Sequence, residues 1–170
     1  MHLDFETLLS ELSALLSDDP SPEPGRGITP ALELIRHSLG IDCCGFMEVH
    51  AGRKQIRMTN VSRGEESEGL GLIMPIINGF PWVYRRLVDQ DSLIAFSSLE
   101  NLPPEANGER DFWENAGIEA LLMIPLHFQG EVTHLLGLAN SRIGPEWPET
   151  LPRRLRLLGE MIAKAIISPV

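Results

Sequence analysis

Two histidines near one another are the first candidates for chemistry in this sequence. His127 and His134 flank Gln129-Gly130, a pair suited to a two-residue hairpin turn. Such a turn pairs His127 with Val132 and places His134 diagonally on the same face, where two imidazole rings can approach one metal ion or one anion. No carboxylate or cysteine completes the set. We therefore predict His127 in solvent, His134 bonded to backbone, and no metal site.

The two cysteines are the second candidates. Cys43 and Cys44 are adjacent on a predicted strand, where neighbouring side chains point to opposite faces and do not bridge each other. A redox-sensing or nitric oxide-sensing thiol needs nearby positive charge, which no residue close in sequence supplies. A cysteine-dependent reductase needs separated thiols, because one must attack the sulfenic acid that forms on the other. We predict that both cysteines pack inside the domain.

Motifs of enzyme catalysis are missing from the sequence. No serine lies in a Gly-x-Ser-x-Gly turn, and no glycine-rich phosphate loop precedes a helix. We predict a protein that is not an enzyme. Trp82 and Trp113 are better suited to binding, since indole combines a large apolar area with one donor. Arg110 binds an anion through paired donors, pairs locally with Glu109 or Glu114, or is solvated.

Composition restricts the class of partner. The chain of 170 residues has 24 acidic residues and 14 Lys or Arg, for a net charge of −10. This charge repels phosphate backbones, so we predict no nucleic-acid partner. No apolar run approaches the roughly 20 residues of a membrane span, and no signal-peptide pattern opens the chain. We predict a cytoplasmic protein without a membrane partner.

Hydrophobic periodicity predicts the elements that position these residues. Amphipathic helices are predicted at 3–16, 30–39 and 152–166, with short helical segments at 81–88 and 110–115. Strands are predicted at 42–50, 55–61, 93–96, 119–127 and 132–140. Antiparallel strands flanked by helices indicate an α+β fold. Prolines and glycines interrupt the chain after the first helix, so we divide it into an N-terminal helix and linker (1–27) and one domain (28–170).

The run from Trp82 to Ile166 resembles the second half of GAF domains found ahead of bacterial sensor histidine kinases. The resemblance is carried by Asp91-Ser92-Leu93-Ile94-Ala95-Phe96, Leu102-Pro103-Pro104-Glu105-Ala106, Gly117-Ile118, Leu122-Met123-Ile124-Pro125-Leu126 and Leu136-Gly137-Leu138. It implies a GAF/PAS-like central antiparallel sheet of five or six strands. The terminal helices lie on one face of such a sheet, and a loop-roofed pocket lies on the other.

The resemblance also implies a function and a site. It implies a sensory domain of two-component systems that binds a small molecule and acts through its terminal helices. The expected partners are a second copy of the chain, bound through the N- and C-terminal helices, and an output domain or effector such as a histidine kinase. The expected ligand-binding residues are Cys44, Phe46, Phe80, Trp82, Arg110 and Trp113.

Departures from defined subfamilies leave the ligand and cofactor unassigned. The spaced signature of cyclic-nucleotide-binding GAF domains is not reproduced. A covalent bilin uses a cysteine in the later loops, whereas both cysteines here lie on the first predicted strand. Two alternatives to a ligand sensor remain: a ligand-free dimerisation or interaction domain with a filled core, and a cysteine-dependent redox enzyme.

Overall fold

A six-stranded antiparallel sheet forms the centre of the molecule. The computed structural model describes residues 4–17, 28–64, 76–77 and 80–167. The strand order is β3-β2-β1-β6-β5-β4. The strands are β1 (Cys43–His50), β2 (Gln55–Arg63), β3 (Ile76–Ile77), β4 (Ile94–Phe96), β5 (Ala120–Phe128) and β6 (Glu131–Asn140). The predicted α+β class and strand number are confirmed. Periodicity did not predict β3, because two residues are too few to show a repeat.

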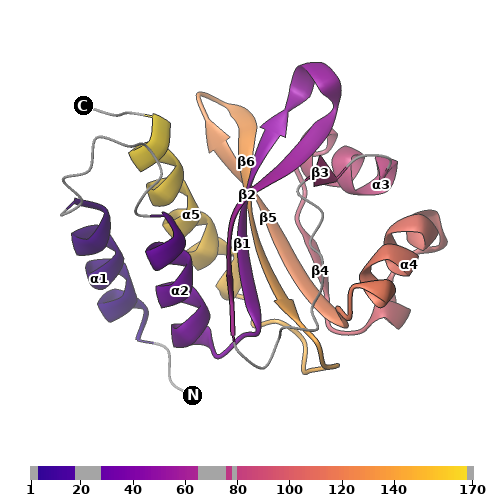
Figure 1. The fold of residues 1–170 in the computed structure, drawn as a ribbon, viewed down its shortest axis with the longest axis horizontal. Coiled ribbons are helices and arrows are strands. Elements are labelled where there is room, and N and C mark those ends of the chain that lie inside the picture. Colours follow the sequence, from indigo (N-terminus) through magenta and orange to yellow (C-terminus); the bar gives the residue numbers. More distant parts are fainter. Residues whose placement is uncertain (1–3, 18–27, 65–75, 78–79, 168–170) are drawn as a thin grey trace.

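Helices cover both faces of the sheet (Figure 1). The helix layer consists of α1 (Phe5–Ser17), α2 (Ile28–Leu39) and α5 (Leu151–Ile167). The opposite face carries α3 (Pro81–Tyr84), the π-helical turn η3 (Arg85–Asp89), the 3-10 turns η4 (Leu99–Asn101) and η5 (Pro104–Ala106), and α4 (Asn107–Asn115). We call these elements the roof. A further 3-10 turn, η1 (Ala51–Arg53), lies in the β1–β2 hairpin.

Side chains alternate along each strand, so the sheet has an apolar core on each face. On β1, Cys44 and Phe46 pack in the helix-layer core, whereas Cys43 and Met47 pack in the roof core. The central strands β5 and β6 add Leu122, Ile124, Leu126, Leu136 and Leu138 to the first core, and Leu121, Met123, Leu135 and Ala139 to the second. Burial on both faces explains why these two strands are apolar almost throughout.

The first helix shares the core of the helix layer. Leu8 and Leu12 of α1 have exposed fractions of 2% and 0%. The guanidinium carbon of Arg154 on α5 lies 5.1 Å from the centre of the Phe5 ring. The predicted linker, residues 18–27, lies outside the described residues, and the domain boundary placed there stays a prediction.

The last helix rests on the sheet through a glycine. The buried apolar side chains of α5 are Leu151, Leu155, Leu158, Ile162 and Ala163. Ala163 is buried, whereas Ala165 on the same helix is exposed. The reason is that the buried Gly159 brings the helix close to β5 on the side of residues 159 and 163. Leu157 on the same helix is 46% exposed.

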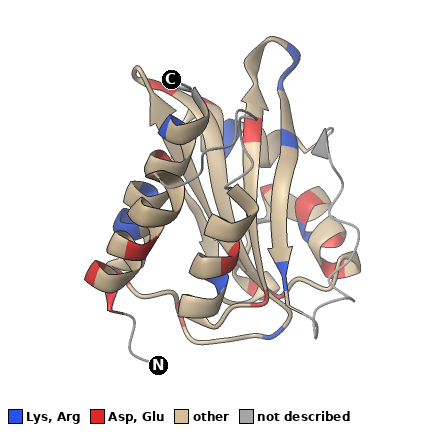
Figure 2. Cartoon of the chain, turned by 60° about the vertical axis from the view of Figure 1, so that its left-hand side comes forward, with Lys and Arg blue, Asp and Glu red and all other residues tan. Residues whose placement is uncertain are grey.

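Charges of both signs are distributed over the helix layer. Figure 2 shows Lys and Arg scattered among Asp and Glu on this side of the molecule, with no basic patch in the part drawn in colour. Within the described ranges, no helix combines the length and apolar character needed to cross a bilayer.

Candidate functional site

A small apolar cavity lies between the sheet and α4. Its volume is about 60 Å³. The lining residues are Cys43, Gly45, Met47, Met58, Phe112, Trp113, Ala116, Ile118, Leu121, Met123, Gly137 and Ala139. None of these side chains is charged at neutral pH, so the interior suits an apolar guest.

Two glycines facing each other make room for the cavity. Gly45 on β1 and Gly137 on β6 are direct cross-strand partners. A Cβ atom at residue 45 would lie 2.9 Å from Sδ of Met58, and one at residue 137 would lie 3.1 Å from Cε of Met47. The sheet therefore has a depression here that the methionine side chains partly fill. Methionine is unbranched and flexible, so this floor can adapt to a guest.

Cys43 is the one titratable side chain in the lining. Burial raises its pKa to about 11, against the opposing effect of Arg63 and Arg36. Arg63 is its partner across the β1–β2 pairing, so the structure supplies the positive charge that was not found close in sequence. The effect of burial on the Cys43 pKa outweighs that of this positive charge. Burial also raises the pKa of Cys44, which packs on the opposite face of the sheet. Both thiols stay protonated at neutral pH and are poor nucleophiles.

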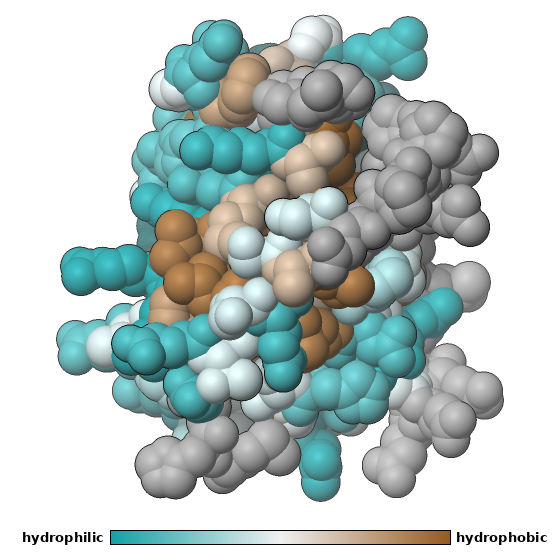
Figure 3. Space-filling view, turned by 90° about the vertical axis from the view of Figure 1, so that its left-hand side faces the viewer, coloured by the Kyte–Doolittle hydropathy of each residue, from teal (hydrophilic) through white to brown (hydrophobic). Residues whose placement is uncertain are grey.

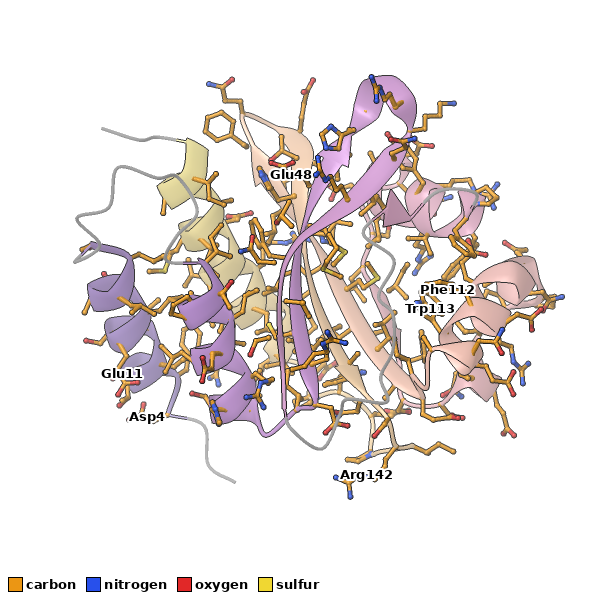
Figure 4. The ribbon with its side chains drawn as sticks, viewed as in Figure 1. Asp4, Glu11, Glu48, Phe112, Trp113 and Arg142 are labelled. Atoms are coloured by element: carbon orange, nitrogen blue, oxygen red, sulfur yellow. The ribbon has the colours of Figure 1, made fainter. Side chains whose placement is uncertain are left out.

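Aromatic pairs join α4 to the sheet and to the start of α3. Phe112 and Trp113 lie on the side of α4 that faces the sheet (Figure 4). The Trp113 ring centre is 5.2 Å from that of Phe96 on β4, and the Phe112 ring centre is 4.9 Å from that of Phe80. Tilted pairs at such distances add about 0.5–1.5 kcal/mol each beyond area burial. They hold α4 over the cavity.

A buried carboxylate connects two roof helices. Glu109 in the first turn of α4 is 3% exposed, and its Oε2 accepts a hydrogen bond of 3.0 Å from the backbone N–H of Val83. Val83 lies in the first turn of α3, where backbone N–H groups lack helical partners and favour a negative charge. From the sequence, Glu109 is expected only as one of two local partners of Arg110. Its partner is 26 residues away in the chain, so local spacing gave no signal.

The six expected ligand-binding residues lie in different parts of the structure. Trp113 lines the cavity. Phe80 and Trp82 belong to the roof but border other surface clefts, of about 310 and 380 Å³. Arg110 is half-buried on α4 and is not among the cavity-lining residues.

Cys44 and Phe46 lie on the other side of the sheet, in the helix-layer core. The six residues therefore do not form one site. Cys43 and Met47, the strand neighbours of Cys44 and Phe46, line the cavity instead. The alternation of side chains along β1 places Cys44 and Phe46 on one face and Cys43 and Met47 on the other, but only the packing of the sheet decides which face the roof covers.

The two histidines lie in different surroundings. His127 pairs with Val132 as predicted, but its ring is half-buried, and its Nε2 is 2.7 Å from Oδ2 of Asp91. His134 is buried and bonds the neighbouring Thr133 hydroxyl at 2.8 Å rather than backbone. Its ring stacks on Phe46, with centres 5.3 Å apart. Burial lowers its pKa, against an opposing effect of Glu48. Within the described ranges, no group of three His, Cys, Asp or Glu side chains is arranged to hold a metal ion.

The architecture defines an α+β domain with a helix layer on one face of an antiparallel sheet and a roofed cavity on the other. The sequence matches no family model and no curated protein. The fold, however, matches solved structures over nearly its whole length.

The phycocyanobilin-bound GAF domain of a cyanobacterial phytochrome aligns with a TM-score of 0.77 and 16% identity, covering 99% of this chain and 97% of that one. The GAF domain of a phosphoenolpyruvate-protein phosphotransferase from Coxiella burnetii aligns with a TM-score of 0.69 and 15% identity, over 96% and 93%. Free methionine-R-sulfoxide reductase from Neisseria meningitidis, solved with its substrate, aligns with a TM-score of 0.70 and 12% identity, over 96% and 88%. This chain has the GAF-domain fold.

Proposed function

We propose that this chain is a non-catalytic sensory domain that binds a small apolar molecule between the sheet and α4. The observation that carries the proposal is the depression at the paired Gly45 and Gly137, roofed by Phe112 and Trp113. Glycine weakens a strand, so two facing glycines in the sheet centre need a compensating role. Space for a guest is such a role. The phytochrome GAF domain, which has the same fold, is solved with a bound chromophore.

The cavity volume limits the guest. At about 60 Å³, the cavity is much smaller than the roughly 300–1,000 Å³ of drug-sized sites. Its lining is apolar, so polar guests would lose hydrogen bonds on entry. A molecule of a few apolar atoms fits the existing cavity. A larger one requires the side chains of Met47, Met58 and Met123 to move.

Xenon binding followed by NMR tests the proposal, since xenon enters dry apolar cavities. Raising the xenon pressure should shift amide signals of Gly45 and Gly137 in a saturable way. The double variant Gly45→Ala, Gly137→Ala should lose the response, because the two new methyl groups fill the depression and crowd the Met58 and Met47 side chains that line the cavity. Gly52→Ala is the matched control, since no atom lies within 4 Å of its Cβ position. The absence of saturable shifts in the wild type would refute an accessible apolar site.

The placement of the two thiols supports a domain that is not a cysteine-dependent enzyme. A reductase of this fold is known, but here Cys43 and Cys44 are buried and belong to opposite cores. A resolving thiol must reach the sulfenic acid on its partner, and these two thiols point to opposite faces of the same strand, β1. Methionine sulfoxide turnover by the wild type that disappears in the Cys43→Ser, Cys44→Ser variant would overturn this part of the proposal.

A second candidate function is self-association through the terminal helices, with or without a ligand. Figure 3 shows an apolar area on the outer side of the helix layer. Leu157 on α5 is 46% exposed in this layer. In a sensor the same face would connect to an output domain or to an effector such as a histidine kinase. We propose a homodimer that buries this face.

Sedimentation across a concentration series tests the homodimer. Leu157→Glu should weaken self-association, because a carboxylate in an apolar interface must be desolvated. Ile143→Glu is the matched control: Ile143 is 67% exposed but lies in the loop between β6 and α5. A wild-type chain that stays monomeric at every concentration would refute self-association. Equal weakening by both substitutions would refute the proposed face.

A further inference from the structure

His127 connects the roof side of the molecule to the helix layer. Its Nε2 is 2.7 Å from Oδ2 of Asp91, and its Nδ1 is 3.7 Å from Oε1 of Glu160. Asp91 lies in the loop between η3 and β4, and Glu160 lies on α5. The roof and α5 cover opposite faces of the sheet (Figure 1). One imidazole ring therefore lies between carboxylates from both layers.

Backbone geometry brings the three side chains together. β4 pairs only with residues 121–123 of β5, so the outer edge of β5 beyond Met123 is left for the preceding loop. Asp91 has a φ of 49°, a left-handed conformation that Asp tolerates better than most residues. On β6, Thr133 has no register partner on β5, since Leu126 pairs with His134 and His127 with Val132. This irregularity falls beside His127, and such irregularities commonly redirect a side chain.

The close packing of α5 completes the arrangement. A Cβ atom on Gly159 would lie 2.7 Å from Cδ2 of Leu126, so helix and strand are in direct contact at this point. Glu160 and His127 are the next residues of the helix and the strand. His127 is also four residues from Met123, which lines the cavity on the same strand. β5 thus runs from the cavity to this contact over about 13 Å.

The number of ring protons decides how many carboxylates His127 can bind. An ionised carboxylate only accepts hydrogen bonds, so the 2.7 Å contact requires a hydrogen on Nε2. In the neutral ring, Nδ1 then presents a lone pair to Glu160. The imidazolium has hydrogens on both nitrogens and attracts both carboxylates.

The surroundings of the ring are otherwise simple. Among the described residues, the charged partners of the ring are Asp91 and Glu160. Its partner on β6, Val132, is apolar. On α5, Arg156 and Lys164 lie one helical turn before and after Glu160, and Arg153 lies two turns before it on the same side of the helix.

We propose that Asp91, His127 and Glu160 form a proton-dependent tie that holds α5 to the roof-side loop. Protonation of His127 closes the tie and slows opening of the last turns of α5; deprotonation releases Glu160. The tie itself is independent of any guest. Its regulatory meaning rests on the proposed sensory function, in which the cavity on β5 signals through α5.

Hydrogen exchange of the full chain at pH 6 and pH 8, corrected for intrinsic exchange rates, tests the tie. Protection of the 160–167 amides should be about threefold higher at pH 6. This difference should disappear in His127→Gln and in Glu160→Gln. His50→Gln is the matched control, because His50 pairs with one carboxylate, Glu48, at 3.4 Å and belongs to the β1–β2 hairpin. It should keep the wild-type difference.

Two outcomes would overturn the tie. One is equal corrected protection of α5 at both pH values in the wild type. The other is the same pH dependence in His127→Gln as in His50→Gln. No guest is present in these measurements, so the xenon experiment can fail while the tie holds, and the tie can fail while xenon binds.

Discussion

Gly159 offers the sharpest test of how α5 is held against the sheet. In Gly159→Ala, the new Cβ would lie 2.7 Å from Cδ2 and 2.9 Å from Cδ1 of Leu126. Carbon atoms in good contact are about 3.5–4.0 Å apart. The helix or the leucine must therefore shift by about 1 Å. Leu126 is 0% exposed, so its movement disturbs the surrounding core.

The size of the effect follows from two opposing contributions. Overpacking a core costs about 1–3 kcal/mol. Replacing glycine by alanine inside a helix returns about 1 kcal/mol through helix propensity. We expect Gly159→Ala to lower the free energy of unfolding by about 1 kcal/mol, as measured by urea denaturation followed by circular dichroism.

A matched control separates propensity from packing. Gly108→Ala adds the same methyl group to α4, where no atom lies within 4 Å of the Cβ position, so this variant should be neutral or more stable. Combining Gly159→Ala with Leu126→Val should cost less than the sum of the single changes, because the smaller side chain relieves the contact. If Gly159→Ala stabilised the chain as much as Gly108→Ala, the close approach of α5 to β5 would be refuted.

Three further predictions concern buried polar and sulfur groups. Burial lowers the pKa of His134 from 6.5, so the unfolded chain binds more protons than the folded chain around and below pH 6.5, and the free energy of unfolding should decrease as the pH is lowered through this range. His134→Gln should make the free energy of unfolding, measured by urea titration, less different between pH 5.5 and pH 7.5. With a pKa of about 11, about one Cys43 side chain in a thousand is a thiolate at pH 8. Iodoacetamide should therefore label the buried Cys43 and Cys44 slowly in the folded chain and quickly once urea is added, whereas rapid labelling of the folded chain would contradict their burial. Glu109→Ala leaves the Val83 N–H without its partner and should cost about 1–3 kcal/mol in thermal or urea unfolding, more than Glu114→Ala at an exposed site of the same helix.

The elements of this protein follow from short-range patterns. The stretches 119–127 and 132–140 are apolar enough to predict central strands, and Gln129-Gly130 predicts their hairpin and the pairing of His127 with Val132. The adjacency of Cys43 and Cys44 predicts that they occupy opposite faces, as the two cores confirm. These predictions succeed because repeat and turn chemistry act within a few residues.

The candidate site depends on contacts between distant parts of the chain. The partners Gly45 and Gly137 come from different hairpins, and His127 bonds a residue 36 positions away. By itself, the sequence determined the main helices, every strand except β3 and the opposite orientation of neighbouring side chains, because backbone periodicity is local. Only the tertiary structure decided that the roof covers the face of Cys43 rather than Cys44, because that choice depends on how the strands pair and where the helices pack.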